Sequence, residues 1–155
     1  MANQKQFIVS DLRTLEWAAS LTPPTKRFYL FVAADTSQEP VGRISDFAIA
    51  ALSTGVVYLC AWGNGCERFH DIVDECIADA DLELRKFVRP NDKDVVMTTW
   101  HSQETLKDAL DFFASCAVPT NGFAEDSDFR IVACVGHPEW AFSAKEWLVS
   151  MGYFI

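Results

Sequence analysis

The sequence is short of the features that mark several large classes of protein. Its 155 residues include only 7 glycines and 6 prolines, which excludes collagen-like and low-complexity chains. No apolar run reaches the roughly 18 residues that a membrane-spanning helix needs, and the N-terminus lacks the long apolar stretch of a signal peptide. The five cysteines form no CxxC or other metal-binding spacing. We therefore expect a cytoplasmic protein without a disulfide framework, in which Cys60, Cys76, Cys116 and Cys134 lie in the core.

Positive charge is scarce as well. The chain has 13 Lys and Arg against 22 Asp and Glu, so the formal net charge is −9. Such a balance argues against nucleic acid and anionic membranes as partners, because both repel an acidic surface. Half of the residues are apolar, and 155 residues suit one domain with a core of useful size.

Buried strands and amphipathic helices alternate along most of the chain. Nearly continuous apolar runs predict strands at Phe28–Ala33, Val56–Ala61, Val95–Thr99 and Phe129–Val135, with a short fifth at Tyr153–Ile155. Apolar residues at helical spacing predict four helices between and after them. These begin near Ile44, at Asn64 as N-cap with Glu67 as its N3 partner, at Ser102, and at Pro138. Gly55 and Gly152 are placed to end the first and last of these helices.

The order of elements predicts one α/β domain over residues 1–155. Alternating strands and helices build a three-layer α/β/α sandwich with a mostly parallel sheet of four or five strands, flavodoxin- or Rossmann-like. Residues 1–27 are expected to form an N-terminal helix around Asp11–Leu21 and a Pro-rich break, and residues 28–155 the core. The polar stretch Asp79–Asp94 is interpreted as a surface insertion that could include a short edge strand.

Histidine and tryptophan gather in the loops that follow the predicted strands. Parallel α/β sheets bind ligands outside the carboxyl ends of their strands, so these loops are where a site is expected. In a flavodoxin-like order the first and third predicted strands are neighbours, which would bring the loop at 35–37 next to Trp100 and His101. The predicted ligand-binding residues are Asp35, Thr36, Ser37, Trp62, Trp100, His101 and His137. Structural roles are the competing interpretation, because Trp commonly covers a core and His commonly caps a helix.

Candidate catalytic residues are few. Cys66 is the one cysteine outside a core run, in the expected first turn of a helix, where the dipole lowers a thiol pKa. His70, four residues on, could act as its base. The catalytic candidates are Cys66, Glu67, His70 and His101. A small residue at a helix start beside a solvated histidine explains the first pair equally simply, since no third group is present to orient the histidine.

Acidic residues dominate the segment 67–83. It holds seven acids and one base, Arg68. A lone Glu67-x-x-His70 lacks the second copy that a dimetal carboxylate site requires, so no metal is predicted. A solvated helix face accounts for the stripe, and so does a docking surface for a protein with a basic surface, because a patch of one sign steers association. The predicted partner-binding residues are Glu67, Asp71, Asp74 and Glu75.

Common cofactor and nucleophile motifs are missing. The sequence has no GxGxxG after its first predicted strand, no P-loop and no GxSxG elbow. The loop Asp35-Thr36-Ser37 lacks the glycine of a flavodoxin phosphate loop, and no cofactor is predicted.

The order strand, Trp62-Gly63-x-Gly65-Cys66-Glu67-x-x-His70-Asp71, then Val95 to His101 resembles a family of small bacterial proteins classed as a domain of unknown function. The resemblance covers about residues 28–142 and implies a bacterial or phage-associated cytoplasmic protein, with no implied activity. Cys66-Glu67 also resembles the cysteine and the NAD-cleaving glutamate of TIR-type domains. The opening strand motif of those domains is absent, and Glu67 as a helix-capping residue is the simpler account.

Two functions follow as hypotheses. The first is an acidic recognition protein that binds a protein partner without catalysis. The alternative is an enzyme or ligand-binding protein that acts on a nucleotide-like small molecule, in a crevice at the carboxyl ends of the strands. Convergence of the tryptophans and histidines on one pocket would favour the alternative.

Overall fold

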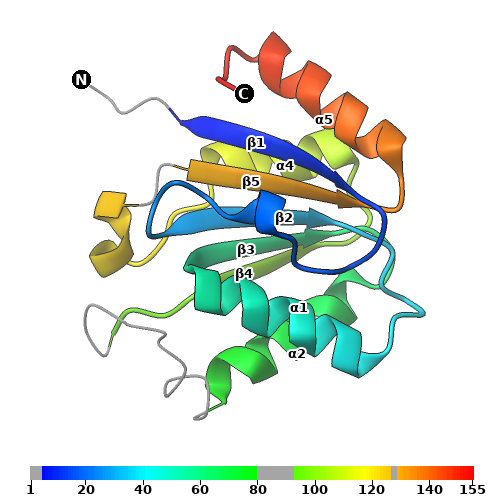
Figure 1. Ribbon diagram of the computed structural model, residues 1–155. Coiled ribbons are helices and arrows are strands. Elements are labelled where there is room, and N and C mark those ends of the chain that lie inside the picture. Colours follow the sequence, from blue (N-terminus) through cyan, green and yellow to red (C-terminus); the bar gives the residue numbers. More distant parts are fainter. Residues whose placement is uncertain (1–4, 80–92, 127–128) are drawn as a thin grey trace.

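Five parallel strands form a single sheet in the computed structural model, with helices on both of its faces (Figure 1). The structure describes residues 5–79, 93–126 and 129–155. The strands are β1 (Gln6–Leu12), β2 (Phe28–Ala33), β3 (Val56–Trp62), β4 (Met97–His101) and β5 (Phe129–Val135), and their order in the sheet is β1-β5-β2-β3-β4. The predicted α/β fold with a parallel sheet is confirmed. Of the predicted insertion at Asp79–Asp94, residues 80–92 lie outside the described residues.

The central strands are buried on both faces, as their continuous apolar sequences predict. Every residue of β2 and of β5 is buried. Successive side chains point to opposite faces of a strand, and β2 accordingly places Leu30 and Val32 in one core and Tyr29 and Phe31 in the other. Helices α1 (Val41–Thr54) and α2 (Cys66–Ala78) cover the first core, and α4 (Leu106–Ser115) and α5 (Pro138–Ser150) cover the second. The molecule is a three-layer sandwich.

The ends of α1 and α5 follow the sequence signals. Gly55 ends α1 with φ 120°, and a β-carbon there would lie 2.1 Å from the Lys26 carbonyl oxygen, so only glycine fits. Pro138 stands in the first turn of α5, where its missing N–H costs nothing.

The predicted N-terminal helix is wrong. Residues Gln6–Leu12 form β1, which pairs in parallel with β5, and only a short 3-10 turn at Ala19–Leu21 follows. Alternation decides the outcome: Phe7 and Val9 are buried while the residues between and around them are not. The predicted strand at Tyr153–Ile155 is reduced to a single bridge between Phe154 and Gln6, so the fifth strand comes from the opposite end of the chain.

The strand order locates the expected binding edge. Reading β4-β3-β2-β5 gives the 3-2-1-4 order of a Rossmann-like doubly wound sheet, with β1 added beyond β5. The order reverses between β2 and β5, which is where ligands bind in such sheets. The flavodoxin-like arrangement considered from the sequence is wrong, because β3 separates β2 from β4.

Two helices begin later than the sequence suggested. Helix α2 starts at Cys66 with Gly65 as its N-cap in the left-handed conformation, φ 82°, so Asn64 is not the cap. Helix α4 starts at Leu106, and its N-cap Thr105 accepts a hydrogen bond from the Asp108 N–H at 3.1 Å. Ser102 cannot begin that helix, because Gln103 takes a positive φ of 60°.

Within the described part of the chain, no helix is long and apolar enough to cross a membrane.

Candidate functional site

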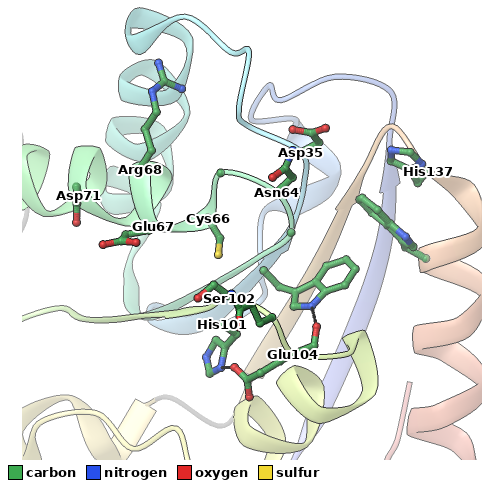
Figure 2. Close-up of a pocket in the computed structure, with 15 residues that line it drawn as sticks. Asp35, Asn64, Cys66, Glu67, Arg68, Asp71, His101, Ser102, Glu104 and His137 are labelled. Atoms are coloured by element: carbon green, nitrogen blue, oxygen red, sulfur yellow. Dashed lines mark hydrogen bonds and ion pairs between the residues drawn. The ribbon is translucent and has the colours of Figure 1, made fainter.

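A pocket of about 900 Å³ opens at the carboxyl edge of the sheet (Figure 2). Loops after four neighbouring strands line it: Asp35 follows β2, residues 62–68 end β3 and begin α2, residues 101–104 follow β4, and His137 and Trp140 follow β5. Because the strands are parallel, their carboxyl ends meet at one edge, and the reversal between β2 and β5 separates Asp35 from His137. Of the predicted ligand-binding residues, Asp35, Trp62, His101 and His137 line this pocket.

Three aromatic side chains form one wall of the pocket. The rings of Trp62 and Trp140 meet edge to face, with centroids 5.0 Å apart at 83°. The His137 ring stacks on Trp140 at 3.9 Å and 29°. Such a cluster offers large, weakly polar ring surfaces against which a planar or cationic group can pack. Trp140 was not among the predicted site residues, although its loop was.

The turn at 101–104 forms the rim of the pocket next to this wall. The indole N–H of Trp62 donates to the backbone carbonyl of Glu104 at 2.8 Å, so the loops after β3 and β4 are joined. Gln103 is the one non-glycine residue with a positive φ among the residues that the structure describes. A side chain in that conformation costs free energy, and such residues gather at functional sites.

His101 connects the rim to the sheet. Its Nδ1 lies 2.7 Å from Glu104 Oε2 and its Nε2 lies 3.0 Å from Thr99 Oγ1. Because a carboxylate only accepts, the imidazole donates its Nδ1–H to Glu104. The ring is buried and packs on Phe112 with centroids 4.8 Å apart, which fixes its orientation. His101 therefore orients the Glu104 carboxylate through Nδ1, while the contact of Nε2 with Thr99 helps to fix the ring.

The loop after β2 is held by its own side chains. Asp35 accepts hydrogen bonds from the hydroxyl of Ser37 at 2.7 Å and from its backbone N–H at 3.1 Å. These bonds favour the charged form and lower the pKa of the Asp35 carboxyl below its usual value. Ser37, predicted to bind ligand, serves this turn instead.

Thr36 has a structural role. It is buried, and its hydroxyl donates to the carbonyl of Gly65 at 3.0 Å. The guanidinium of Arg68 in turn donates to the carbonyl of Thr36 at 2.8 Å. Thr36 thus ties the loop after β2 to the start of α2 and does not line the pocket, contrary to its predicted role.

Cys66 lies in the core. Its residue is only 3% exposed, although its side chain borders the pocket floor beside His101 and Ser102 (Figure 2). Burial raises the pKa of the Cys66 thiol, and nearby backbone N–H groups oppose this shift less strongly. This direction is opposite to the lowered thiol pKa expected at a helix start, because removal from water outweighs the backbone N–H groups. Cys116, predicted to be buried, is exposed.

His70 and Trp100 lie together and do not line the pocket. The His70 ring packs against Trp100 with centroids 4.5 Å apart, and its Nδ1 and Nε2 lie 3.0 Å and 3.4 Å from carboxylate oxygens of Asp71 and Asp74. Asp74 also accepts a hydrogen bond from Thr98 at 2.6 Å. This cluster joins α2 to β4. Both ring nitrogens of His70 therefore face carboxylates and not Cys66. Trp100 is not among the residues that line this pocket.

The acidic stripe is divided by the fold. Glu67 and Asp71 line the pocket, Asp74 belongs to the His70 cluster, and Glu75 is exposed on α2. Asp81 and Glu83 lie outside the described residues. In the described parts of the chain, no three His, Cys, Asp or Glu side chains are arranged to hold a metal ion.

Several lining residues were missed from the sequence: Asn64, Arg68, Asp71 as a pocket residue, Ser102, Gln103, Glu104 and Trp140. The spacing of His101 and Glu104 could have indicated Glu104, because side chains three residues apart across a tight turn can contact each other. The position of Trp140 could also have indicated it. The first turn of a helix that follows a strand lies at the carboxyl edge of the sheet, where the pocket opens.

Comparison with known proteins identifies the family and leaves the activity open. Residues 10–149 match the model of a domain of unknown function, DUF7684. No curated protein and no solved structure matches the chain, and nothing supports the likeness to TIR-type domains. The resemblance to a domain of unknown function is confirmed, and the match begins at residue 10, within β1, while bacterial or phage origin stays a prediction. The chain belongs to the DUF7684 family.

Proposed function

We propose that this protein binds a small molecule with a planar ring in the pocket at the carboxyl edge of its sheet. The observation that carries the proposal is the joining of an aromatic wall to polar side chains from the loops after β2, β3, β4 and β5, around a space of about 900 Å³. Pockets of this size, with ring surfaces and a few fixed polar groups, are typical of small-molecule sites.

The rim is organised before any ligand arrives. Trp62 is fixed by its hydrogen bond to Glu104, Glu104 by His101, and Asp35 by Ser37. Groups held in this way lose little conformational freedom on binding, which favours affinity. The backbone of Gln103 is also strained by its positive φ. Such strain is retained where the surrounding structure holds a loop in one conformation.

Recognition without covalent catalysis fits the site better than nucleophilic chemistry. Covalent catalysis needs a nucleophile with a lowered pKa or an adjacent oriented base. Cys66 has a raised pKa, and the ring nitrogens of His70 face Asp71 and Asp74. Among the described residues, the fixed groups around the pocket are hydrogen-bonding and stacking groups.

A thermal-shift screen with nucleosides, quinolines and other ring compounds tests this function. A ligand at 100 times its Kd stabilises the folded protein by about 2.7 kcal/mol. We expect the shift to disappear in Trp62→Ala and to persist in Trp100→Ala, a matched control because Trp100 contacts His70 outside the pocket. Equal loss in both variants, or equal persistence, would contradict binding at this site.

A second candidate function is recognition of a protein with a basic surface. The observation that favours it is the exposure of Glu67, Asp71 and Glu75 along α2, with Arg68 bonded to Thr36. Once a partner is identified by cross-linking to α2, Asp71→Lys with Glu75→Lys should lower the association rate at low salt by about tenfold or more. An unchanged rate would exclude this surface.

A further inference from the structure

We propose that the pocket selects a cation: the planar group that it binds carries a positive charge, as a charged heterocycle, an amidinium or a guanidinium. This inference rests on the proposed function, since it concerns the ligand of the same pocket. Three features of the pocket support a cation: its aromatic wall, the charges around the cavity and the contacts that hold the Glu104 carboxylate.

The aromatic wall suits a cation. Indole faces carry partial negative charge and attract a positive group placed over them, more strongly where water is excluded. Trp62 and Trp140 meet edge to face, so the planes of the two indole rings are nearly perpendicular. The Nε1–H of Trp62, its positive edge, is turned to the Glu104 carbonyl and is already paired.

Acidic side chains outnumber basic ones around the cavity. Four acids border the pocket: Asp35 after β2, Glu67 and Asp71 on α2, and Glu104 after β4. The basic side chain on the described lining is Arg68, which donates to the Thr36 carbonyl and points away from Cys66 and His101 in Figure 2. A cavity walled by protein focuses such a field, and the local concentration of cations rises.

The Glu104 carboxylate is held by a buried histidine. One of its oxygens, Oε2, accepts a hydrogen bond from Nδ1 of His101. The other ring nitrogen of His101, Nε2, contacts Thr99 on β4. The remaining oxygen retains its acceptor capacity, because a carboxylate has room for about four hydrogen bonds. Thr99 and His101 are therefore positioning residues for a charge-assisted hydrogen bond from the ligand to Glu104.

Anions are disfavoured at the same edge. Helix N-termini attract phosphate through their free N–H groups, and α2 and α5 begin beside the pocket. Each already carries an acid in its first turn, Glu67 in α2 and Glu139 in α5. A phosphate at either terminus would meet a carboxylate, so a ligand rich in phosphate does not fit.

Matched probes separate charge from shape. The 1-methylquinolinium ion and quinoline share a bicyclic ring, and at pH 7.5 only the first is charged. Calorimetry at low salt should show at least tenfold tighter binding of 1-methylquinolinium. Equal affinity would overturn the cation inference and leave the proposed function standing. If neither quinoline compound binds up to millimolar concentration, and the peptides described below do not bind either, both the cation inference and the proposed function are overturned.

The cation can come from a free molecule or from an arginine side chain, and two peptides distinguish these sources. Acetyl-Ala-Arg-Ala-amide is compared with the same peptide containing citrulline, a neutral analogue of similar shape. Preference for the arginine peptide over both quinoline compounds would support a side chain as the source. Preference for 1-methylquinolinium with silent peptides would support a free small molecule. If no charged probe exceeds its neutral partner, the inference fails.

Variants then assign the selectivity. Glu104→Gln keeps the backbone carbonyl that accepts from Trp62, and it should lower the ratio of 1-methylquinolinium affinity to quinoline affinity at least threefold. Glu146 is an exposed acid on α5 outside this pocket, and Glu146→Gln, the matched control, should leave this ratio unchanged. Equal preference in wild type and Glu104→Gln would overturn the assignment of this carboxylate.

Discussion

The indole N–H of Trp62 donates to the backbone carbonyl of Glu104 at 2.8 Å, across two loops that follow neighbouring strands. Forty-two residues separate them in the sequence. The bond connects the aromatic wall of the pocket with the turn whose carboxylate is held by His101. A single contact therefore links the ring-binding and the charged parts of the candidate site.

Replacing Trp62 with Phe tests that contact. The variant keeps an aromatic ring and removes the N–H donor, leaving the Glu104 carbonyl without this partner. We expect a loss of about 0.5–1.5 kcal/mol in the free energy of unfolding, the usual net value of one hydrogen bond. Urea denaturation measures it. Trp100→Phe, which retains a ring against His70, is the control; a loss no larger in Trp62→Phe than in the control would contradict the role of the bond.

Gly65 is required by the packing of two loops. Its φ is 82°, and a β-carbon would lie 2.6 Å from the backbone nitrogen of Ser37. Gly65→Ala should cost about 1–3 kcal/mol of unfolding free energy through strain. Gly42→Ala is the matched control, because nothing lies within 4 Å of its added carbon and it stands in α1. That variant should be unchanged or more stable by up to about 1 kcal/mol. Equal effects would show that the loops are not closely packed.

The thiols should react in an order set by burial. Cys116 is exposed, whereas burial raises the pKa of Cys66 and raises that of Cys60 and Cys134 to about 12. Since the thiolate is the reactive form, iodoacetamide at pH 8 should modify Cys116 first. Mass spectrometry after brief labelling measures the order. Fast modification that persists in Cys116→Ser and maps to Cys66 would contradict the raised pKa of the Cys66 thiol.

Asp35 should titrate at unusually low pH. Hydrogen bonds from the Ser37 hydroxyl and backbone N–H lower its pKa from the ordinary 3.8. A carboxyl with a lowered folded-state pKa stabilises the fold above its unfolded value, and this contribution is lost as the pH falls through the folded value. Ser37→Ala should therefore move the Asp35 titration upward, as followed by carboxyl-carbon NMR, and should reduce stability above about pH 4. An unmoved titration would show that the hydroxyl bond is absent in solution.

The sequence predicts the layers of this protein better than its edges. Continuous apolar runs identified β2, β3 and β5, because strands buried on both faces leave a strong signal. Strand β1 was missed since Phe7 and Val9 alternate with less buried residues over a short stretch, and its partner β5 lies more than a hundred residues away. Long-range pairing of this kind has no local signature.

The site shows the same division. The loops after the strands were identified because topology alone places them at one edge. Strand order was out of reach, so Trp100 was assigned to the pocket although its side chain faces α2 and His70. The reactivity of Cys66 was misjudged because local position predicts a dipole effect, whereas burial depends on how α2 packs against the sheet.

The most direct test of the account is an NMR titration of the five tryptophan indole N–H groups with 1-methylquinolinium, assigned by single substitutions. The account predicts that the signals of Trp62 and Trp140 shift with one common Kd, while Trp17, Trp100 and Trp147 stay unchanged. Shifts confined to those three tryptophans, or none at all with this probe and with quinoline, would contradict a ring-binding pocket at the carboxyl edge of the sheet.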